Sequence, residues 1–354
     1  MSVHPQSASH PSGWLFGIAL HLCLALALVG CGREQQAVEL AGSTMGTTWH
    51  VTYVPSQTSR NPEQVQQTLE ALLEDVNASM STWRPDSEIS RFNRSPVGAW
   101  FPVSPDFARV LAVALAIGDA SDGAYDVTVG PLVSLWGFGP GQPGITVPEE
   151  GAIDAALQQV GQGHLEFDSA NSRLRRTQPV ELDFSSIAKG YAVDVLAQAL
   201  QSEQIGHYLV EVGGEMRVAG NSPRGDAWRV AIEQPHSGER AVALAVALTD
   251  KAIATSGDYR NFFEVDGKRF SHSIDPRTGY PIAHDLVSVT VIADDCTSAD
   301  AWATALTVMG ADAALALAER RQLAVYLMRR SEDGIVTAYS SAFQPWLAAP
   351  EFSQ

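Results

Sequence analysis

Hydrophobic residues between Asn61 and Val76 recur every three to four positions, which places them on one face of a helix. Asn61 is a suitable N-cap for that helix, and Pro62 fits its first turn. The same spacing recurs further along the chain, in segments bounded by Ser, Pro and Gly. The predicted helices cover about residues 62–76, 105–123, 149–160, 187–204 and 298–309, with a further helix after Gly310.

Extended segments dominate the second half of the chain. Phe262–Ile274 predicts a hairpin that turns at Asp266-Gly267, and residues 325–339 predict another around Asp333-Gly334. Single strands are predicted at residues 208–212, 228–233, 242–248 and 286–293. Helices and strands mix without a regular βαβ order or an internal repeat. The pattern therefore predicts an α+β fold with mixed or antiparallel sheets and flanking helices.

The N-terminus is typical of a targeting segment. Residues 14–29 are almost entirely apolar but short for a membrane span, as in a secretory signal peptide. They end in Leu28-Val29-Gly30-Cys31, which resembles the lipobox of bacterial lipoproteins. We therefore predict a signal peptide over residues 1–30, a lipidated Cys31 and a short tether over residues 31–37. No Lys or Arg precedes residue 14, which departs from the usual signal peptide. An N-terminal membrane anchor that is never cleaved is the alternative. Both interpretations place the body of the protein outside the cytoplasm.

Charge and cysteine content narrow the classes of function. The formal net charge of −17 would repel nucleic-acid phosphates, so we expect no nucleic-acid partner. An anionic cofactor would need local compensation from a metal or a helix N-terminus. Loss of Cys23 with the signal peptide and acylation of Cys31 would leave Cys296 without a partner, so no disulfide is expected.

Common short motifs are missing from the sequence. It contains no Gly-x-Gly-x-x-Gly after a first strand, no Walker loop, and no Cys or His pair at zinc spacing. Gly213-Gly214-Glu215 is too short to cradle phosphates by itself. The informative segments are longer: Gly42–Thr48, Met80–Asn93, Gly123–Gly139, Leu182–Asp194, and a fifth in three parts, Thr255–Asn261, Ser271–Gly279 and Ala299–Leu306.

In this order and spacing, the five segments resemble the ApbE family, the FAD:protein FMN transferases. The resemblance runs from about Val38 to Thr337. It implies a single compact catalytic domain over residues 38–345, followed by a tail at 346–354. It also implies Mg²⁺-dependent transfer of FMN from FAD to a threonine of an acceptor protein, through a phosphoester and with release of AMP.

Two residues of the fifth segment suit a metal ion. Asp300 and Thr304 are four positions apart on a predicted helix, so their side chains share a face. A carboxylate and a hydroxyl are hard oxygen ligands of the kind that Mg²⁺ binds. The resemblance implies that they hold Mg²⁺ together with a main-chain oxygen at Ser186. Alternatively, Asp300 caps a helix that begins near Ser298, and Thr304 bonds back to the preceding turn.

Residues 183–189 lie where a strand is predicted to lead into a helix. Free N–H groups at a helix start suit a pyrophosphate, and Lys189 adds a cation. The resemblance implies that Asp183 contacts FAD; an ordinary cap by Asp183 or Ser185 beside a solvated lysine is the alternative. The further cofactor-binding positions that it implies are Met45 and Trp83, which flank the flavin, Ala124, Tyr125 and Asp126, which act partly through backbone groups, and Ile274. A tryptophan taken alone is more often part of a core.

His272 is the candidate catalytic residue. A base with a pKa near neutral can accept the proton of an attacking threonine hydroxyl. Asp275 either orients the imidazole or begins the turn over residues 275–279. A surface histidine or a core histidine with satisfied hydrogen bonds is the alternative interpretation.

Two other functions remain open at this point: an FAD pyrophosphatase, and a non-enzymatic flavin-binding lipoprotein. The resemblance suggests a membrane redox subunit as the acceptor protein. We expect the protein at a bacterial inner membrane, held by its lipid on the periplasmic side, with the outer membrane as the alternative.

Overall fold

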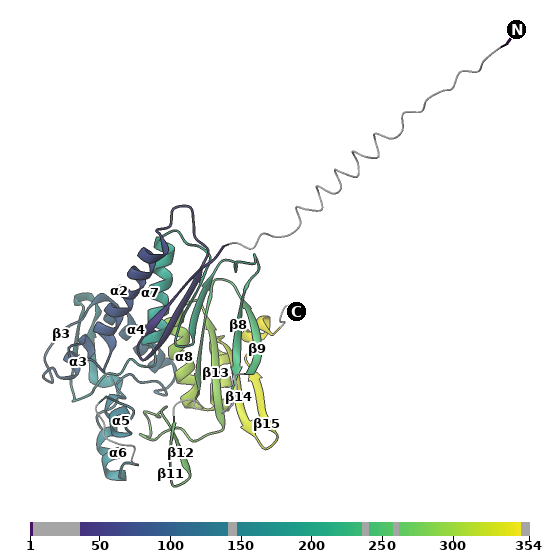
Figure 1. The fold of residues 1–354 in the computed structure, drawn as a ribbon. Coiled ribbons are helices and arrows are strands. Elements are labelled where there is room, and N and C mark those ends of the chain that lie inside the picture. Colours follow the sequence, from purple (N-terminus) through teal and green to yellow (C-terminus); the bar gives the residue numbers. More distant parts are fainter. Residues whose placement is uncertain (3–35, 141–146, 236–240, 258–261, 348–354) are drawn as a thin grey trace.

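The computed structural model describes residues 1–2, 36–140, 147–235, 241–257 and 262–347. An eight-stranded antiparallel sheet forms its centre, in the order β1-β2-β6-β7-β10-β13-β14-β15 (Figure 1). The strands of this sheet are β1 (Val38–Thr44), β2 (Thr47–Tyr53), β6 (Tyr208–Val212), β7 (Glu215–Ala219), β10 (Lys251–Gly257), β13 (Leu286–Ala293), β14 (Ala324–Ser331) and β15 (Gly334–Tyr339). The predicted α+β class is confirmed.

Helices cover one face of the sheet, and a hairpin packs on the other (Figure 1). The larger helices are α2 (Pro62–Met80), α4 (Pro105–Ala120), α7 (Ala188–Ser202), α8 (Cys296–Met309) and α9 (Ala311–Arg321). The hairpin consists of β8 (Trp228–Gln234) and β9 (Ala241–Leu248). Strand β13 explains this arrangement, because seven of its eight residues are buried in succession. A strand with two apolar faces needs cover on both sides.

Smaller elements complete the domain. Helix α3 (Glu88–Asn93) follows α2, and β3 (Phe101–Pro102), β5 (Arg173–Arg176) and β4 (Leu165–Asp168) form a small separate sheet. Helices α5 (Gly130–Leu135) and α6 (Glu150–Leu157) pack with the hairpin of β11 (Phe262–Val265) and β12 (Lys268–Ser271) at the lower edge of Figure 1. We call these four elements, together with residues 272–280 that follow β12 and pack on them, the lobe. The lobe has an apolar core of its own, built around Leu132, Trp136, Ile153, Phe263 and Phe270.

The sequence predicted the start of two helices correctly. Oδ1 of Asn61 accepts a hydrogen bond from the N–H of Gln64, and Oγ of Ser104 accepts one from the N–H of Phe107. The start of α8 was predicted wrongly. This helix begins at Cys296 with Asp295 as its cap, so Asp300 lies in its second turn and cannot cap it.

Other boundaries also differ from the prediction. Glu181 forms only an isolated bridge with Val129, so no regular strand leads into α7. Strand β12 ends at Ser271, three residues before the predicted hairpin end, because the chain turns through residues 275–279. Among the described residues, no helix is both long and apolar enough to cross a bilayer. Residues 3–30 of the predicted signal peptide and Cys31 lie outside the described residues.

Candidate functional site

A cavity of about 460 Å³ opens where the lobe meets α7, α8 and the central sheet. This volume is in the range of small-molecule sites. Ten of the twelve residues predicted for metal binding, cofactor binding or catalysis line it. They are Ala124, Tyr125, Asp126, Asp183, Ser186, Lys189, His272, Ile274, Asp300 and Thr304.

Helix α8 brings Asp300 and Thr304 to the cavity from one face, as their spacing predicts. Oδ2 of Asp300 accepts a hydrogen bond from the backbone N–H of Gly190 at 3.0 Å. Oγ1 of Thr304 lies 3.1 Å from Oγ of Ser256 on β10. Asp300 is almost fully buried, and burial raises the pKa of its carboxyl against the opposing effect of Lys189.

Lys189 stands between two carboxylates. Its Nζ lies 2.8 Å from Oε1 of Glu215 and 3.9 Å from Oδ2 of Asp300. Burial alone would lower the pKa of Lys189, but the charges of Asp300 and Glu215 outweigh burial and raise it. Burial also raises the pKa of Glu215 to about 7, because two buried carboxylates face a single ammonium. A further cation at this wall of the cavity would therefore be favoured by the two carboxylates.

The start of α7 differs from an open anion seat. The N–H of Ala188 donates to the carbonyl oxygen of Phe184, and the N–H of Gly190 donates to Asp300. Asp183 accepts from the N–H of Ser185 at 2.7 Å, so it does cap the turn that precedes the helix. Several N–H groups at this helix start are therefore used within the protein, and the side chain of Lys189 adds a positive charge beside them.

Residues 124–126 form a tight loop against this helix start. The hydroxyl of Tyr125 lies 3.0 Å from Oγ of Ser186. The carboxylate of Asp126 accepts hydrogen bonds from the N–H and hydroxyl of Thr128 and from the N–H of Gln162. Because its oxygens hold the loop together, the backbone of this segment is the part left to face a cofactor.

His272 follows β12 and belongs to the lobe. Its ring lies edge-on to that of Phe138, with 6.3 Å between ring centroids. The carboxylate of Asp275 binds Arg277 through both oxygens, at 2.9 and 2.8 Å, and its carbonyl accepts from the N–H of Gly279. Of the two predicted roles for Asp275, the turn is therefore the one that its contacts support.

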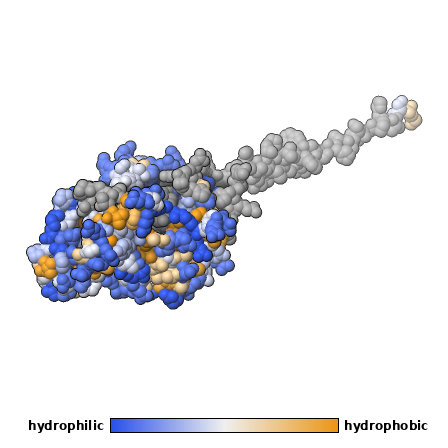
Figure 2. Space-filling model, turned by 90° about the horizontal axis from the view of Figure 1, so that it is seen from below, coloured by the Kyte–Doolittle hydropathy of each residue, from blue (hydrophilic) through white to orange (hydrophobic). Residues whose placement is uncertain are grey.

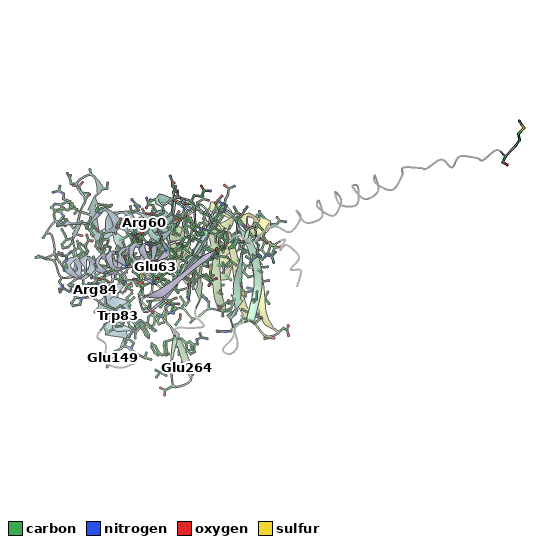
Figure 3. The ribbon with its side chains drawn as sticks, turned by 45° about the horizontal axis from the view of Figure 1, so that its top comes forward. Arg60, Glu63, Trp83, Arg84, Glu149 and Glu264 are labelled. Atoms are coloured by element: carbon green, nitrogen blue, oxygen red, sulfur yellow. The ribbon has the colours of Figure 1, made fainter. Side chains whose placement is uncertain are left out.

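Met45 and Trp83 do not line the cavity. The side chain of Trp83 is 67% exposed, so the interpretation of this tryptophan as core is wrong (Figure 3). Met45 occupies the two-residue turn between β1 and β2 with a positive φ of 49°, next to Gly46. That turn approaches the cavity rim, because the N–H of Gly213 donates to the carbonyl oxygen of Thr48. An extended ligand could reach both side chains only by leaving the cavity.

Sequence reasoning missed Glu215. Gly213-Gly214, too short for a phosphate loop, turns the chain between β6 and β7. A Cβ on Gly213 would lie 3.1 Å from Cδ of Lys189, so the glycine leaves room for the lysine stem. An acidic residue directly after a glycine pair at a strand start was the available signal.

The residues present fit a magnesium ion better than a transition metal. The described part of the chain holds no group of three or more His, Cys, Asp or Glu side chains arranged for a metal. Asp300 and Thr304 offer oxygen ligands only, and Mg²⁺ typically takes one or two carboxylates with phosphate and water.

Comparisons with known proteins point in the same direction. The sequence model of the ApbE family matches residues 45–327. The chain is 45% identical over 332 residues to an FAD:protein FMN transferase of Haemophilus influenzae, covering 91% of this chain and 95% of the relative. It is 43% identical to the protein of that name from Vibrio cholerae, covering 95% and 99%. The solved structure of the flavin transferase ApbE from Vibrio cholerae superposes with a TM-score of 0.83 at 42% identity, covering 88% and 99%.

Proposed function

This chain belongs to the ApbE family, and on that premise we propose that it transfers FMN from FAD to a threonine of an acceptor protein, with Mg²⁺ bound. One observation carries the proposal. Oxygen donors of α8, the ammonium of Lys189 and the imidazole of His272 come from distant parts of the sequence and line the same cavity. Their chemistry suits an attack on a diphosphate.

The reaction replaces one phosphorus–oxygen bond by another. The threonine Oγ attacks the phosphorus on the FMN side of the FAD anhydride, and a new O–P bond forms. The bond between that phosphorus and the bridging oxygen breaks, and AMP leaves with the electron pair. The threonine proton passes to the imidazole of His272, which lies in the cavity wall. FMN remains on the acceptor as a phosphoester.

Asp300, Thr304 and a main-chain oxygen of Ser186 would hold the metal. When bound, Mg²⁺ supplies positive charge that offsets the charge developing on the phosphate oxygens. Lys189 adds a second positive charge from α7, held in place by Glu215. These groups bind and orient the diphosphate, while Ala124, Tyr125 and Ile274 provide contact surface for the rest of FAD.

The acceptor is expected to approach from the lobe, since His272 belongs to it. Figure 2 shows this side of the molecule, where apolar surface lies among polar surface. Phe262 on β11, which pairs with Ser271, and Tyr280 are 41% and 43% exposed. Exposed aromatic side chains beside a catalytic base suit recognition of a protein segment.

A transfer assay tests the proposal. Purified protein, FAD, Mg²⁺ and a candidate acceptor are mixed, and the acceptor is weighed by mass spectrometry. Covalent addition of FMN, lost on Thr→Ala in the acceptor, is the expected result. AMP release without an adduct would instead indicate an FAD pyrophosphatase. Intact bound FAD would indicate a flavin-storage protein.

We also propose that Cys31 carries lipid and holds the enzyme at the periplasmic side of the inner membrane, near a membrane redox subunit that serves as acceptor. The lipobox at residues 28–31 supports this placement. Cys31→Ser is expected to abolish labelling by radioactive palmitate, while the uncleaved apolar segment before it keeps the chain at the membrane. Unchanged labelling would exclude Cys31 as the lipid site.

A further inference from the structure

Asp194 of α7 lies outside the cavity and accepts four hydrogen bonds, three of them from the start of α8. Its Oδ1 accepts from the N–H of Cys296 at 3.0 Å and from the guanidinium of Arg217 at 2.6 Å. Its Oδ2 accepts from the N–H of Thr297 at 2.8 Å and from the hydroxyl of Thr297 at 2.6 Å. Both oxygens of a largely buried carboxylate are thereby occupied by the first turn of another helix and by β7.

The two helices hold each other in both directions. Asp194 reaches from α7 to the first turn of α8, and Asp300 reaches from α8 back to the N–H of Gly190 in the first turn of α7. Gly190 makes the close approach possible. A Cβ at this position would overlap the carbonyl oxygen of Cys296 and lie 2.7 Å from Cβ of Asp300. The placement of the Asp300 carboxylate thus depends on how α8 sits against α7.

Helix capping alone does not account for Asp194. Asp295 already caps α8, since its Oδ1 accepts from the N–H of Ser298 at 2.7 Å. Asp194 binds the two preceding N–H groups, those of Cys296 and Thr297, and does so from a neighbouring helix. A negative charge near a helix N-terminus is favourable. Because Asp194 belongs to α7, its hydrogen bonds also hold α8 in position against α7.

We propose that Asp194 is a positioning residue for the metal-binding pair: it sets the distance and rotation of α8 so that Asp300 and Thr304 meet one cation. The inference rests on the proposed metal site. It assigns to Asp194 no contact with substrate or metal. Residues that orient metal ligands commonly change metal affinity by about 10- to 100-fold when they are removed.

Direct Mn²⁺ binding to the purified protein without FAD tests the inference, with free Mn²⁺ measured by electron paramagnetic resonance. Asp194→Ala is expected to raise the Mn²⁺ dissociation constant by about tenfold or more. Asp194→Asn retains one acceptor oxygen and is expected to fall between Asp194→Ala and the parent. If Asp194→Ala does not fold, the Asn variant carries the test by itself.

Glu88→Ala is the matched control. Glu88 is also a buried carboxylate at the start of a helix, α4, where it accepts hydrogen bonds from the N–H and hydroxyl of Ser104 and from Ser79. It does not line the cavity. Glu88→Ala is expected to lose stability to denaturant as Asp194→Ala does, yet to bind Mn²⁺ as the parent does.

The outcomes separate this inference from its premise. If Asp300→Ala abolishes Mn²⁺ binding while both Asp194 variants bind like the parent, the positioning role is overturned and the metal site stands. A Glu88→Ala variant that binds as weakly as Asp194→Ala would also overturn it, as an effect of general destabilisation. If Asp300→Ala binds Mn²⁺ like the parent, the metal site itself is wrong and the inference falls with it.

Discussion

Lys189 and the buried Glu215 form a partly exposed ion pair in the cavity wall, with 2.8 Å between Nζ and Oε1. The second oxygen of Glu215 has no hydrogen-bond partner among the described residues. With Asp300 also nearby, the negative charge of this cluster exceeds its positive charge when both carboxyls are ionised. The cluster therefore favours a ligand with net positive charge. Without one, the carboxylates of Glu215 and Asp300 repel each other.

Glu215→Gln is expected to flatten the pH dependence of stability between about pH 4.5 and pH 7. The folded protein keeps Glu215 protonated up to its pKa of about 7, whereas an unfolded chain releases that proton near 4.5. Unfolding therefore releases a proton in this window. The free energy of unfolding of the parent should fall as pH rises through it, by on the order of 3 kcal/mol.

Denaturant unfolding in EDTA across this window measures the effect. The Asp300 carboxyl, whose pKa is also raised, contributes in the same direction, so the variant should reduce the slope without removing it. Glu63→Gln, which alters an exposed carboxylate on α2, should keep the parent slope. Equal slopes in the parent and in Glu215→Gln would contradict the prediction.

His272→Ala is expected to retain FAD binding and to slow FMN transfer by about 10²- to 10⁴-fold, the usual contribution of a general base. The imidazole lines the cavity from the segment after β12, whereas the proposed metal-binding pair is on α8. Equilibrium binding of FAD and single-turnover transfer separate the two effects. His50→Ala, which removes an exposed histidine paired with Glu211, is the control. Unchanged turnover would remove His272 from the mechanism.

Thr304→Val is expected to raise the Mg²⁺ concentration for half-maximal transfer by about tenfold, while Thr304→Ser stays close to the parent. Valine keeps the shape of threonine but lacks the hydroxyl ligand. Because Oγ1 of Thr304 also bonds Oγ of Ser256, Ser256→Ala is needed as a control. It removes the same hydrogen bond and keeps the ligand.

EDTA should stop transfer in every variant, and restored Mg²⁺ should recover it. A Ser256→Ala effect equal to that of Thr304→Val would assign the loss to the hydrogen bond.

Trp83→Ala is expected to weaken FAD binding by about tenfold, if the ring stacks on the flavin as the family resemblance implies. Its free energy of unfolding should change by no more than about 0.5 kcal/mol, because the side chain is exposed. Trp136→Ala provides the contrast: this ring is buried in the lobe, and its loss should cost about 3 to 5 kcal/mol. Flavin fluorescence titration and denaturant unfolding give the two quantities. Unaltered FAD affinity in Trp83→Ala would exclude stacking.

The sequence identified helix starts well where a side chain makes a local hydrogen bond. Asn61 and Ser104 act within three residues of their own position, so spacing alone reveals them. The alternative that Asp300 caps α8 is wrong, because Asp295 is the cap. Each of these aspartates is followed directly by a small residue, so their local sequences look alike. Local spacing does not tell which of two acids ends up inside the helix.

The long-range part of the site could not be derived from spacing. Glu215 meets Lys189 only because β7 packs beside α7, and Asp194 meets Thr297 only because α7 packs beside α8. Strands β1 and β2 were also missed as a pair, although their register places Met45 in a tight turn. Only the family resemblance predicted that the five segments meet at one site. The periodicity of hydrophobic residues carries no such information.

The lobe has a small apolar core that is separate from the large core beneath the central sheet. His272 lies on the segment of the lobe that follows β12. Domains open in parts, and the free energy of local opening is low where few apolar contacts are buried. Mild heating should therefore unfold the lobe first and displace His272. The enzyme should then lose activity reversibly while Asp300 and Thr304 on α8 keep their positions.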